Sequence, residues 1–327
     1  MRAVARVVTI LYLCALMLSL SACRKTEPVS RTGFALDTLI EIRIYETKDG
    51  VNANEVLNAC FTEIARCENL FSATVENSDI ARINRAQGAA VAVDPETAQL
   101  LTESLKYAAL SNGAFDVTLR SVTELWDFSA KRLPSEESLA AALENVGYQR
   151  LTVDGMTVTA DGVKLDLGGI AKGYIADRVR DLLETNGVTS AMIDLGGNIV
   201  ACGSKAGEAW RIGVKDPNDT ESLCAVITGE DIAVVTSGTY ERGFDLDGVR
   251  YHHLLSPQTG MPVQNGLASV TITCRDAVQA DALSTACFVL GEEKGKSLID
   301  SLDGVEALFV RADGTLAATA GLSYTIA

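Results

Sequence analysis

The chain has 327 residues, of which 47% are apolar, with 28 basic and 43 acidic side chains and a formal net charge of −15. This composition excludes a disordered chain, a collagen-like repeat and a disulfide-stabilised miniprotein, because the chain can bury a core and is long enough for one or two domains. The acidic balance argues against nucleic acid as a partner, and the only two histidines are adjacent, which excludes a zinc site built on dispersed histidines.

The N-terminal segment has the pattern of an export signal. Arg2 and Arg6 precede an apolar run over 7–20, which is shorter than the ~20 residues that a membrane-spanning helix needs. The run ends in small residues followed by Cys23, which resembles the lipobox of bacterial lipoproteins, where the cysteine is lipidated and becomes the first mature residue. We therefore expect a signal peptide over 1–22, a lipidated tether over 23–32 and a folded domain over 33–327, exported and anchored to the bacterial membrane by lipid; an ordinary secretory signal with a chance cysteine is the alternative.

The first half of the folded body alternates between strand and helix patterns. Isoleucines at 40, 42 and 44 alternate with polar residues, which predicts a strand over 38–45, and apolar residues at helical spacing predict a helix over 57–71 with one buried face. Asp94-Pro95 is typical of a helix start, and Gly113 is typical of the end of that helix. Further predictions are a helix over 135–146 and hairpin turns at Asp154-Gly155 and Asp161-Gly162.

The second half contains more strand patterns than helix patterns. We expect strands over 189–195, 223–228, 231–236, 267–274 and 305–310, and helices over about 170–186, 276–290 and 292–302. No linker divides the body and no long repeat is present. The sequence predicts one α+β unit with mixed, largely antiparallel sheets and flanking helices, arranged as a single lobe or as two.

Paired glycines followed by a lysine stand where a predicted strand gives way to a helix, over 166–173. Free backbone N–H groups at a helix start, with Lys172 nearby, suit a phosphate or pyrophosphate. Taken alone the pattern is weak, because glycine turns before helices are common and such a lysine is usually solvated. It matches neither a P-loop nor a dinucleotide fingerprint.

Asp281 and Thr285 are four residues apart on a predicted helix and therefore share one face. A carboxylate and a hydroxyl are hard oxygen ligands that suit Mg²⁺. The alternative is structural: a threonine that bonds back to its own helix and an acid with no ligand.

Two polar segments, over 236–244 and 251–262, follow a predicted strand. A histidine in the second segment is a candidate general base near neutral pH. Because adjacent strand residues point to opposite faces, at most one of the pair should face a pocket, and both could instead be hydrogen-bonded edge residues.

Taken together, these segments resemble the ApbE family of FAD:protein FMN transferases. The resemblance covers about 33–322 and rests on the order of several segments: Leu36 to Thr38, Phe71-Ser72, Ser78 to Asn84, Gly113 to Thr118, Leu125 to Phe128, Asp166 to Gly173, Leu195 to Asn198, Thr236 to Phe244, His253 to Pro262 and Asp281 to Thr285. It implies a T-fold-like, ApbE-like fold. It also implies a reaction in which Mg²⁺, or Mn²⁺, assists cleavage of FAD, while FMN passes to a threonine hydroxyl of an exported acceptor protein and AMP leaves.

The resemblance also implies roles for individual residues. Asp281, Thr285 and the backbone carbonyl near Gly169 are expected to bind the metal, and His253 is expected to act as the base for the acceptor hydroxyl. The residues expected to contact FAD are Phe115, Asp116 and Thr118 along the flavin-nucleotide groove, Asp166, Lys172, Ser237, Gly238, Thr239, Glu241 and Arg242. The implied acceptors are flavoprotein subunits of RNF and NADH:quinone reductase complexes, or extracellular reductases.

Three positions depart from the family pattern. Ser256 and Thr239 stand where aspartate is common, and Ser121 replaces a usual proline. The missing carboxylate at 256 weakens the case for a second metal in that loop. Two alternatives remain open: a Mg²⁺-dependent FAD pyrophosphatase that releases FMN and AMP, and a flavin-binding lipoprotein without turnover.

Overall fold

The computed structural model describes residues 27–327, and the predicted signal peptide and Cys23 lie outside this part. Its centre is an eight-stranded sheet in the order β1-β2-β6-β7-β10-β13-β14-β15, and every neighbouring pair is antiparallel. These strands are β1 (Val29–Ala35), β2 (Thr38–Thr47), β6 (Val188–Leu195), β7 (Ile199–Cys202), β10 (Ile232–Gly238), β13 (Leu267–Cys274), β14 (Glu306–Arg311) and β15 (Leu316–Ala318). The α+β prediction with largely antiparallel sheets is confirmed.

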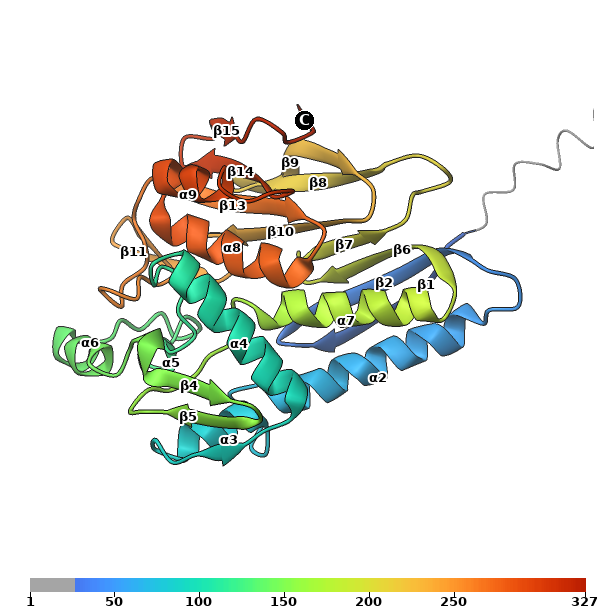
Figure 1. Ribbon diagram of the computed structural model, residues 1–327. Coiled ribbons are helices and arrows are strands. Elements are labelled where there is room, and N and C mark those ends of the chain that lie inside the picture. The colour runs from blue at the N-terminus through green and yellow to red at the C-terminus, as the bar shows by residue number, and fades with distance from the viewer. Residues whose placement is uncertain (1–26) are drawn as a thin grey trace, which may run out of the picture.

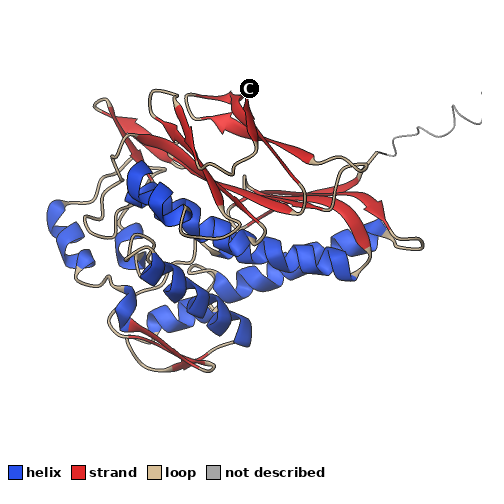
Figure 2. Cartoon of the chain, turned by 45° about the horizontal axis from the view of Figure 1, so that its top comes forward, coloured by secondary structure: helices blue, strands red, loops and turns tan. Residues whose placement is uncertain are grey.

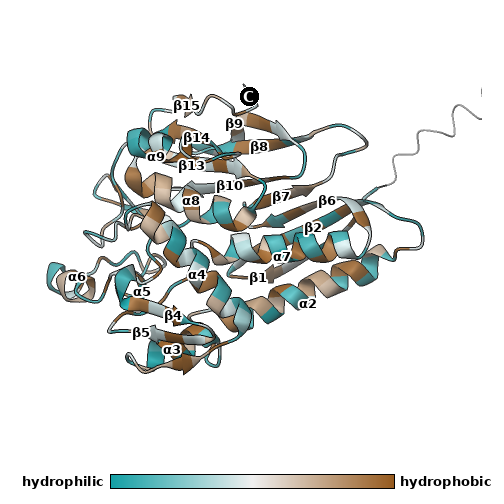
Figure 3. Cartoon of the chain, in the orientation of Figure 1, coloured by the Kyte–Doolittle hydropathy of each residue, from teal (hydrophilic) through white to brown (hydrophobic). Residues whose placement is uncertain are grey.

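Helices cover one face of this sheet (Figures 1 and 2). The α-helices of the described part are α2 (Ala53–Phe71), α3 (Asp79–Arg85), α4 (Pro95–Leu110), α5 (Arg120–Thr123), α6 (Glu136–Leu143), α7 (Ala171–Thr185), α8 (Ala277–Leu290) and α9 (Glu292–Ile299). Figure 3 shows that α2 and α7 alternate apolar and polar residues around their axes, as helices do that bury one face. None of the helices in residues 27–327 has both the length and the apolar composition of a membrane span.

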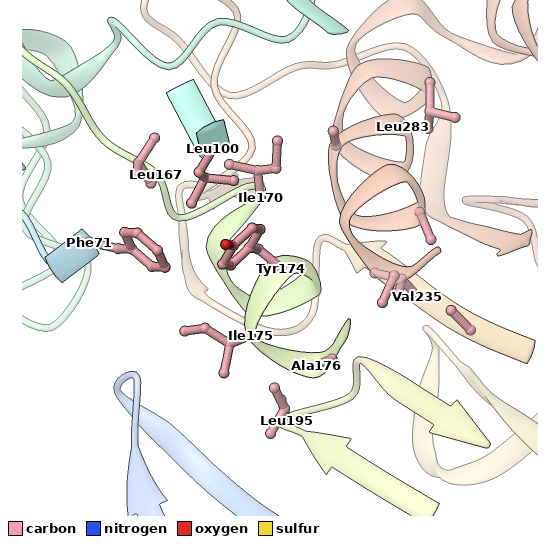
Figure 4. Packing of buried hydrophobic residues seen from close by; sticks show 14 of the residues in the cluster. Phe71, Leu100, Leu167, Ile170, Tyr174, Ile175, Ala176, Leu195, Val235 and Leu283 are labelled. Atoms are coloured by element: carbon pink, nitrogen blue, oxygen red, sulfur yellow. The ribbon is translucent and has the colours of Figure 1, made fainter. Parts of the chain in front are cut away.

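The largest hydrophobic cluster lies between the helices and the sheet. Figure 4 shows Ile170 and Tyr174 of the α7 region, Leu283 of α8 and Val235 of β10, which all belong to this cluster. Tyr174 also meets Phe71 of α2 edge to face, with ring centroids 5.4 Å apart. Both α7 and α8 are therefore fixed to the sheet by buried side chains, and this packing sets where their polar residues lie.

Three smaller sheets complete the fold. A three-stranded sheet in the order β16-β9-β8 packs against the opposite face of the large sheet through Trp210, Ile212 and Val214. The remaining strands are β3 (Val91–Ala92), β4 (Leu151–Asp154), β5 (Thr157–Ala160), β8 (Trp210–Asp216), β9 (Asp219–Gly229), β11 (Gly243–Leu246), β12 (Val249–His252) and β16 (Tyr324–Ile326). β3, β5 and β4 form one sheet, and β11 and β12 form a hairpin.

The structure corrects two local predictions. Strand β1 begins at Val29 and pairs with β2, so residues 29–32 belong to the sheet and not to a tether. Asp154-Gly155 joins β4 to β5 as a hairpin, but Asp161-Gly162 does not form one. After Asp161-Gly162 the chain instead forms a parallel bridge between Lys164 and Leu119 and then continues to the start of α7.

Candidate active site

Several chain segments end at the same edge of the large sheet. β10 ends at Gly238, β6 ends at Leu195, and β2 begins at Thr38, with antiparallel registers that place these ends together. The side chain of Thr38 fills the space beside Gly196 that a Cβ there would occupy. The turn before α7 and the middle of α8 reach this edge too (Figure 1).

Asp166 organises the glycine turn that leads into α7. Its Oδ1 accepts the backbone N–H of Gly168 at 3.0 Å, and its Oδ2 accepts the hydroxyl of Thr123 at 3.0 Å. The guanidinium of Arg120 lies 3.5 Å from the same Oδ2. Both carboxylate oxygens therefore have partners within the protein, so Asp166 shapes the turn in addition to any contact with a ligand.

The predicted metal-binding residues converge. Asp281 is buried on α8, and its Oδ2 accepts the N–H of Gly173 at 2.9 Å, while its Oδ1 lies 3.9 Å from the ammonium of Lys172. Thr285, one turn further along α8, has its hydroxyl oxygen 3.2 Å from the place where a Cβ on Gly169 would lie. The glycine turn before α7 and the middle of α8 therefore lie in contact, as expected for a shared metal site.

Hydroxyl groups line the next part of the site. The Oγ of Ser237 at the end of β10 lies 2.8 Å from that of Ser284 and 3.4 Å from that of Thr285. Gly238 is buried, and Thr239 continues the chain by donating its N–H to the carbonyl of Ala268. Neutral donors and acceptors beside Lys172 suit the oxygens of a phosphate.

His253 lies in the loop after β12. Its Nδ1 is 3.3 Å from the carbonyl oxygen of Arg242, and since a carbonyl only accepts, Nδ1 carries the proton and Nε2 keeps its lone pair. Burial, opposed by this hydrogen bond and assisted by the charge of Lys172, lowers the pKa of His253 to about 4. The ring is therefore neutral at pH 7 and available as a proton acceptor.

The other histidine has a structural position. His252 is buried, and its Nε2 lies 3.1 Å from the carbonyl oxygen of Val263. Its ring also meets Phe288 of α8 edge to face. His252 is therefore buried in the protein, while His253 is partly exposed, and the expectation that at most one of the two faces a pocket stays a prediction.

Glu241 and Arg242 are solvent-accessible residues of the loop between β10 and β11. The Oε1 of Glu241 faces the turn at Gly197, where an added Cβ would lie 3.9 Å away. Although solvent reaches the residue, the surrounding protein desolvates its carboxylate and raises the pKa of Glu241 to about 7; Lys172 opposes this shift and Asp281 reinforces it. These effects place Glu241 within electrostatic reach of the α7 and α8 residues.

Phe115, Asp116 and Thr118 differ in what they offer to a ligand. Phe115 is buried, with Cε2 3.3 Å from the position of a Cβ on Gly169. The Oδ1 of Asp116 accepts both the N–H and the hydroxyl of Thr118, and burial raises the pKa of Asp116. Thr118 is fully buried, and its hydroxyl oxygen also accepts the N–H of Gly147; its contact with FAD stays a prediction.

A cavity of about 190 Å³ opens one helical turn beyond Thr285. Its lining residues are Ser111, Asn112, Gly113, Ala114, Ser256, Pro257, Gln258, Val289, Leu290 and Lys294. No motif in the sequence predicts this cavity. Of its lining residues, Val289 alone is related to a predicted site residue by helical spacing, because it lies four residues after Thr285 on the same face of α8.

The loop beside this cavity is tied to a separate hydrophobic cluster. Trp126 donates its indole N–H to the carbonyl of Gly260 at 3.0 Å, and Leu255 packs with Val122 and Leu139. Ser256, which departs from the family pattern, lies between these two contacts, and its Oγ accepts the N–H of Gln258. The serine therefore closes a local turn.

Comparisons with known proteins agree on one family. A sequence profile of the ApbE family matches residues 36–309. An FAD:protein FMN transferase of Treponema pallidum is 37% identical over 320 residues, covering 91% of this chain and 88% of that relative, and one of Vibrio cholerae is 32% identical over 311 residues, covering 91% and 92%.

Solved structures give the same result. The crystal structure of an ApbE protein from Thermotoga maritima superposes with a TM-score of 0.84 at 36% identity and covers 90% of this chain and 97% of that one. The apo flavinyl transferase ApbE of Pseudomonas stutzeri superposes with a TM-score of 0.80 at 31% identity, covering 90% and 95%.

Proposed function

The chain belongs to the ApbE family of flavin transferases, and we propose that it uses Mg²⁺ to cleave FAD and to attach FMN to a threonine of an exported acceptor protein. The observation that carries this proposal is the convergence of Asp281 and Thr285 on α8 with Gly169 and Lys172 at the start of α7. These groups provide hard oxygen ligands beside a cation and backbone N–H donors, which is what a metal-bound pyrophosphate requires.

The donor set fits Mg²⁺. Oδ1 of Asp281 makes no hydrogen bond within the described protein and lies near Lys172. Thr285 and a backbone carbonyl near Gly169 would complete the protein's share, with water and phosphate oxygens filling the other positions, as is usual for Mg²⁺. When bound, the cation neutralises charge that develops on the phosphate oxygens.

The protein's own residues supply positioning and proton transfer. Lys172 and the turn of Ser237, Gly238 and Thr239 hold the phosphates, and Phe115 packs beneath the glycine turn. The acceptor threonine oxygen forms a bond to the phosphorus of the FMN half while the bond to the bridging oxygen breaks, and AMP leaves with that oxygen. The threonine proton passes to Nε2 of His253, whose other nitrogen is held by Arg242.

We place one end of the dinucleotide toward the cavity bordered by Ser256 and Val289. It lies one turn of α8 from Thr285, so a substrate whose pyrophosphate is near Thr285 can extend into it. The other end would lie toward the loop that carries Glu241 and Arg242.

The test is incubation of the purified chain with FAD, Mg²⁺ and a candidate acceptor domain. We expect AMP release and a mass increase of one FMN on the acceptor, and none on an acceptor whose target threonine is changed to alanine. Absence of both products would overturn the proposal. Rapid AMP release at a rate that the acceptor does not change, with no FMN on the acceptor, would favour a pyrophosphatase. FAD binding without AMP release would favour a binding protein.

We also propose that the protein is exported and held at the membrane by lipid on Cys23, for which the signal pattern is the support. Five residues separate Cys23 from β1. Fully extended, five residues span at most about 18 Å. An anchored domain would therefore lie close to the bilayer. Substitution of Cys23 by alanine should release the protein from the membrane fraction, and retention of that variant would contradict the anchor.

A further inference from the structure

Helices α7 and α8 run antiparallel, and contacts between them repeat every four residues. Gly169 lies beside Thr285, Gly173 bonds to Asp281, and Asp177 bonds to the start of α8 at Ala277. Each step of four toward the end of α7 is matched by a step of four toward the start of α8. The two predicted metal-binding residues and Asp177 therefore lie along one seam between the helices.

Neither helix caps its own N-terminus with a side chain. The N-cap residue of α7 is Ile170, and that of α8 is Asp276, whose side chain makes no capping hydrogen bond. The first N–H groups of a helix need partners, and leaving them unpaired in a buried place is unfavourable. At both ends the partner comes from the other helix.

Asp177 caps α8. Its Oδ1 accepts the N–H of Ala277 and its Oδ2 that of Val278, both at 2.9 Å. Arg180, on the next turn of α7, lies 2.9 Å from Oδ1 of Asp177 and donates to the carbonyl of Arg275 at 2.6 Å. The carboxylate and the guanidinium together hold the first turn of α8 and the residue that leads into it.

Asp281 caps α7 in return, through the N–H of Gly173. A Cβ on Gly173 would overlap the carbonyl oxygen of Ala277 and lie 2.7 Å from the Cβ of Asp281, so glycine is required for this approach. The same carboxylate that caps α7 is the one predicted to bind the metal. Its position therefore depends on how the start of α8 is held one turn earlier.

We propose that Asp177 is a positioning residue: by capping α8 from α7, it sets the register of the two helices and places Asp281 and Thr285 beside the glycine turn. This inference deepens the proposed function and rests on it. Asp177 touches no reacting atom; it acts through α8. Removing one of its oxygens should shift the metal-binding residues while leaving the hydrophobic packing of both helices in place.

The groups around Asp177 both oppose and stabilise its negative charge. Burial raises the pKa of Asp177 to about 6; Arg180 and the N–H groups of Ala277 and Val278 oppose this shift, and Asp276 adds to it. Tyr107 on α4 and Cys274 at the end of β13 are two further titratable groups on which the charge of Asp177 acts. Burying a neutral side chain would cost less free energy than burying a carboxylate. The carboxylate is therefore explained by the two hydrogen bonds that it accepts at the start of α8.

The experiment compares Asp177→Asn with Asp181→Asn in the full chain, purified in detergent. Both changes remove one negative charge from α7, but Asp181 is exposed and contacts only Arg178 among its charged neighbours in the described chain. Mn²⁺ binding is measured by electron paramagnetic resonance with FAD present, and hydrogen exchange is followed in peptides covering 277–285. Thermal unfolding confirms that each variant is folded.

We expect Asp177→Asn to weaken Mn²⁺ binding about tenfold and to speed exchange at the start of α8, because an amide offers one acceptor to two N–H donors. Asp181→Asn should change Mn²⁺ affinity less than threefold. Unchanged Mn²⁺ affinity in Asp177→Asn, or a loss equal to that in Asp181→Asn, would overturn the inference. Asp177→Glu keeps the charge but lengthens the side chain, and wild-type affinity in that variant would show that charge alone matters.

The proposed function is tested separately by the wild type. If the wild-type chain releases AMP and binds Mn²⁺ while Asp177→Asn does so equally well, only the positioning role fails. If the wild type binds no Mn²⁺, the metal site fails and the positioning role fails with it.

Discussion

Two regions border the same site: the seam between α7 and α8, and the segment over 239–265, which contains the β11–β12 hairpin and the loops on either side of it. In the seam, Asp177, Arg180 and Asp281 are largely removed from solvent and bonded across two helices. In that segment, Glu241 and Arg242 are exposed, and His253 is held through the backbone of Arg242. The side chains of the seam are largely buried and bonded within the protein, whereas Glu241 and Arg242 of the second region reach solvent.

This difference suits a transfer reaction with a protein acceptor, which requires both a binding site for the donor and access for the acceptor. Phosphates and a cation need fixed donors whose orientation does not change during the reaction. A macromolecular acceptor needs an accessible approach to the reacting atom. The tests below separate the two regions, beginning with the largest expected effect.

Changing Asp281→Ala should remove measurable transfer, a loss of more than about 10³-fold, because it deletes the buried carboxylate of the metal site and the cap of Gly173. AMP release from FAD is the measurement. Asp303→Ala removes an exposed carboxylate after α9 and should leave turnover unchanged. Retention of a tenth of wild-type activity in Asp281→Ala would contradict the assignment of the seam as the metal site.

Changing His253→Ala should lower the rate of FMN transfer by about 10²-fold, the lower part of the range for a general base, because a pKa near 4 makes a weak one. The affinity for FAD should be nearly unchanged, since the phosphates are held elsewhere. Rate and FAD affinity are measured on the same preparation. His252→Gln is the neighbouring control, which should affect stability more than rate because His252 is buried. A large loss of FAD affinity in His253→Ala would show that His253 itself binds FAD and would contradict a role limited to proton transfer.

Changing Gly173→Ala should destabilise the protein by about 1–3 kcal/mol, the usual effect of overpacking, because the new methyl meets the backbone of Ala277. Urea unfolding is the measurement. Asp181→Ala, on the exposed side of α7, should change the free energy of unfolding by less than about 0.5 kcal/mol. An unchanged midpoint in Gly173→Ala would mean that the helices separate easily and that the seam is not fixed.

The sequence predicts the two partners of the seam but not how they are joined. The spacing of Asp281 and Thr285 indicates one helix face, and the glycines before Lys172 indicate a helix start, so each half follows from local pattern. The cap from Asp177 depends on the antiparallel register of two helices about 100 residues apart along the chain, and no local pattern encodes that register. The cavity beside Ser256 could not be predicted for the same reason: its lining residues come from three segments that are distant in the sequence.

Other misses had a visible signal. Trp210, Ile212 and Val214 alternate with polar residues and glycine, the pattern of the half-buried strand β8. Thr118 shows the reverse case: the resemblance implies that it contacts FAD, whereas the structure adds a hydrogen bond to Asp116 that the sequence did not predict.

The smallest effect concerns Glu241 and tests whether the open loop is electrically coupled to the seam. The native protein holds a proton on this carboxyl up to about pH 7, whereas the unfolded chain releases it near the ordinary value of 4.5. Between these values the native state binds more protons than the unfolded state, so stability contributed by this group falls as pH rises toward 7. In EDTA, Glu241→Gln should therefore lose less thermal stability than the wild type between pH 5 and pH 8, while Glu230→Gln, at an exposed turn, should follow the wild type. Addition of Mg²⁺ should shrink the difference, because a cation near Asp281 favours the charged form of Glu241. Parallel pH profiles of the wild type and Glu241→Gln in EDTA would show that the pKa of Glu241 is not raised, and a difference that Mg²⁺ leaves unchanged would show that Glu241 and the seam act independently.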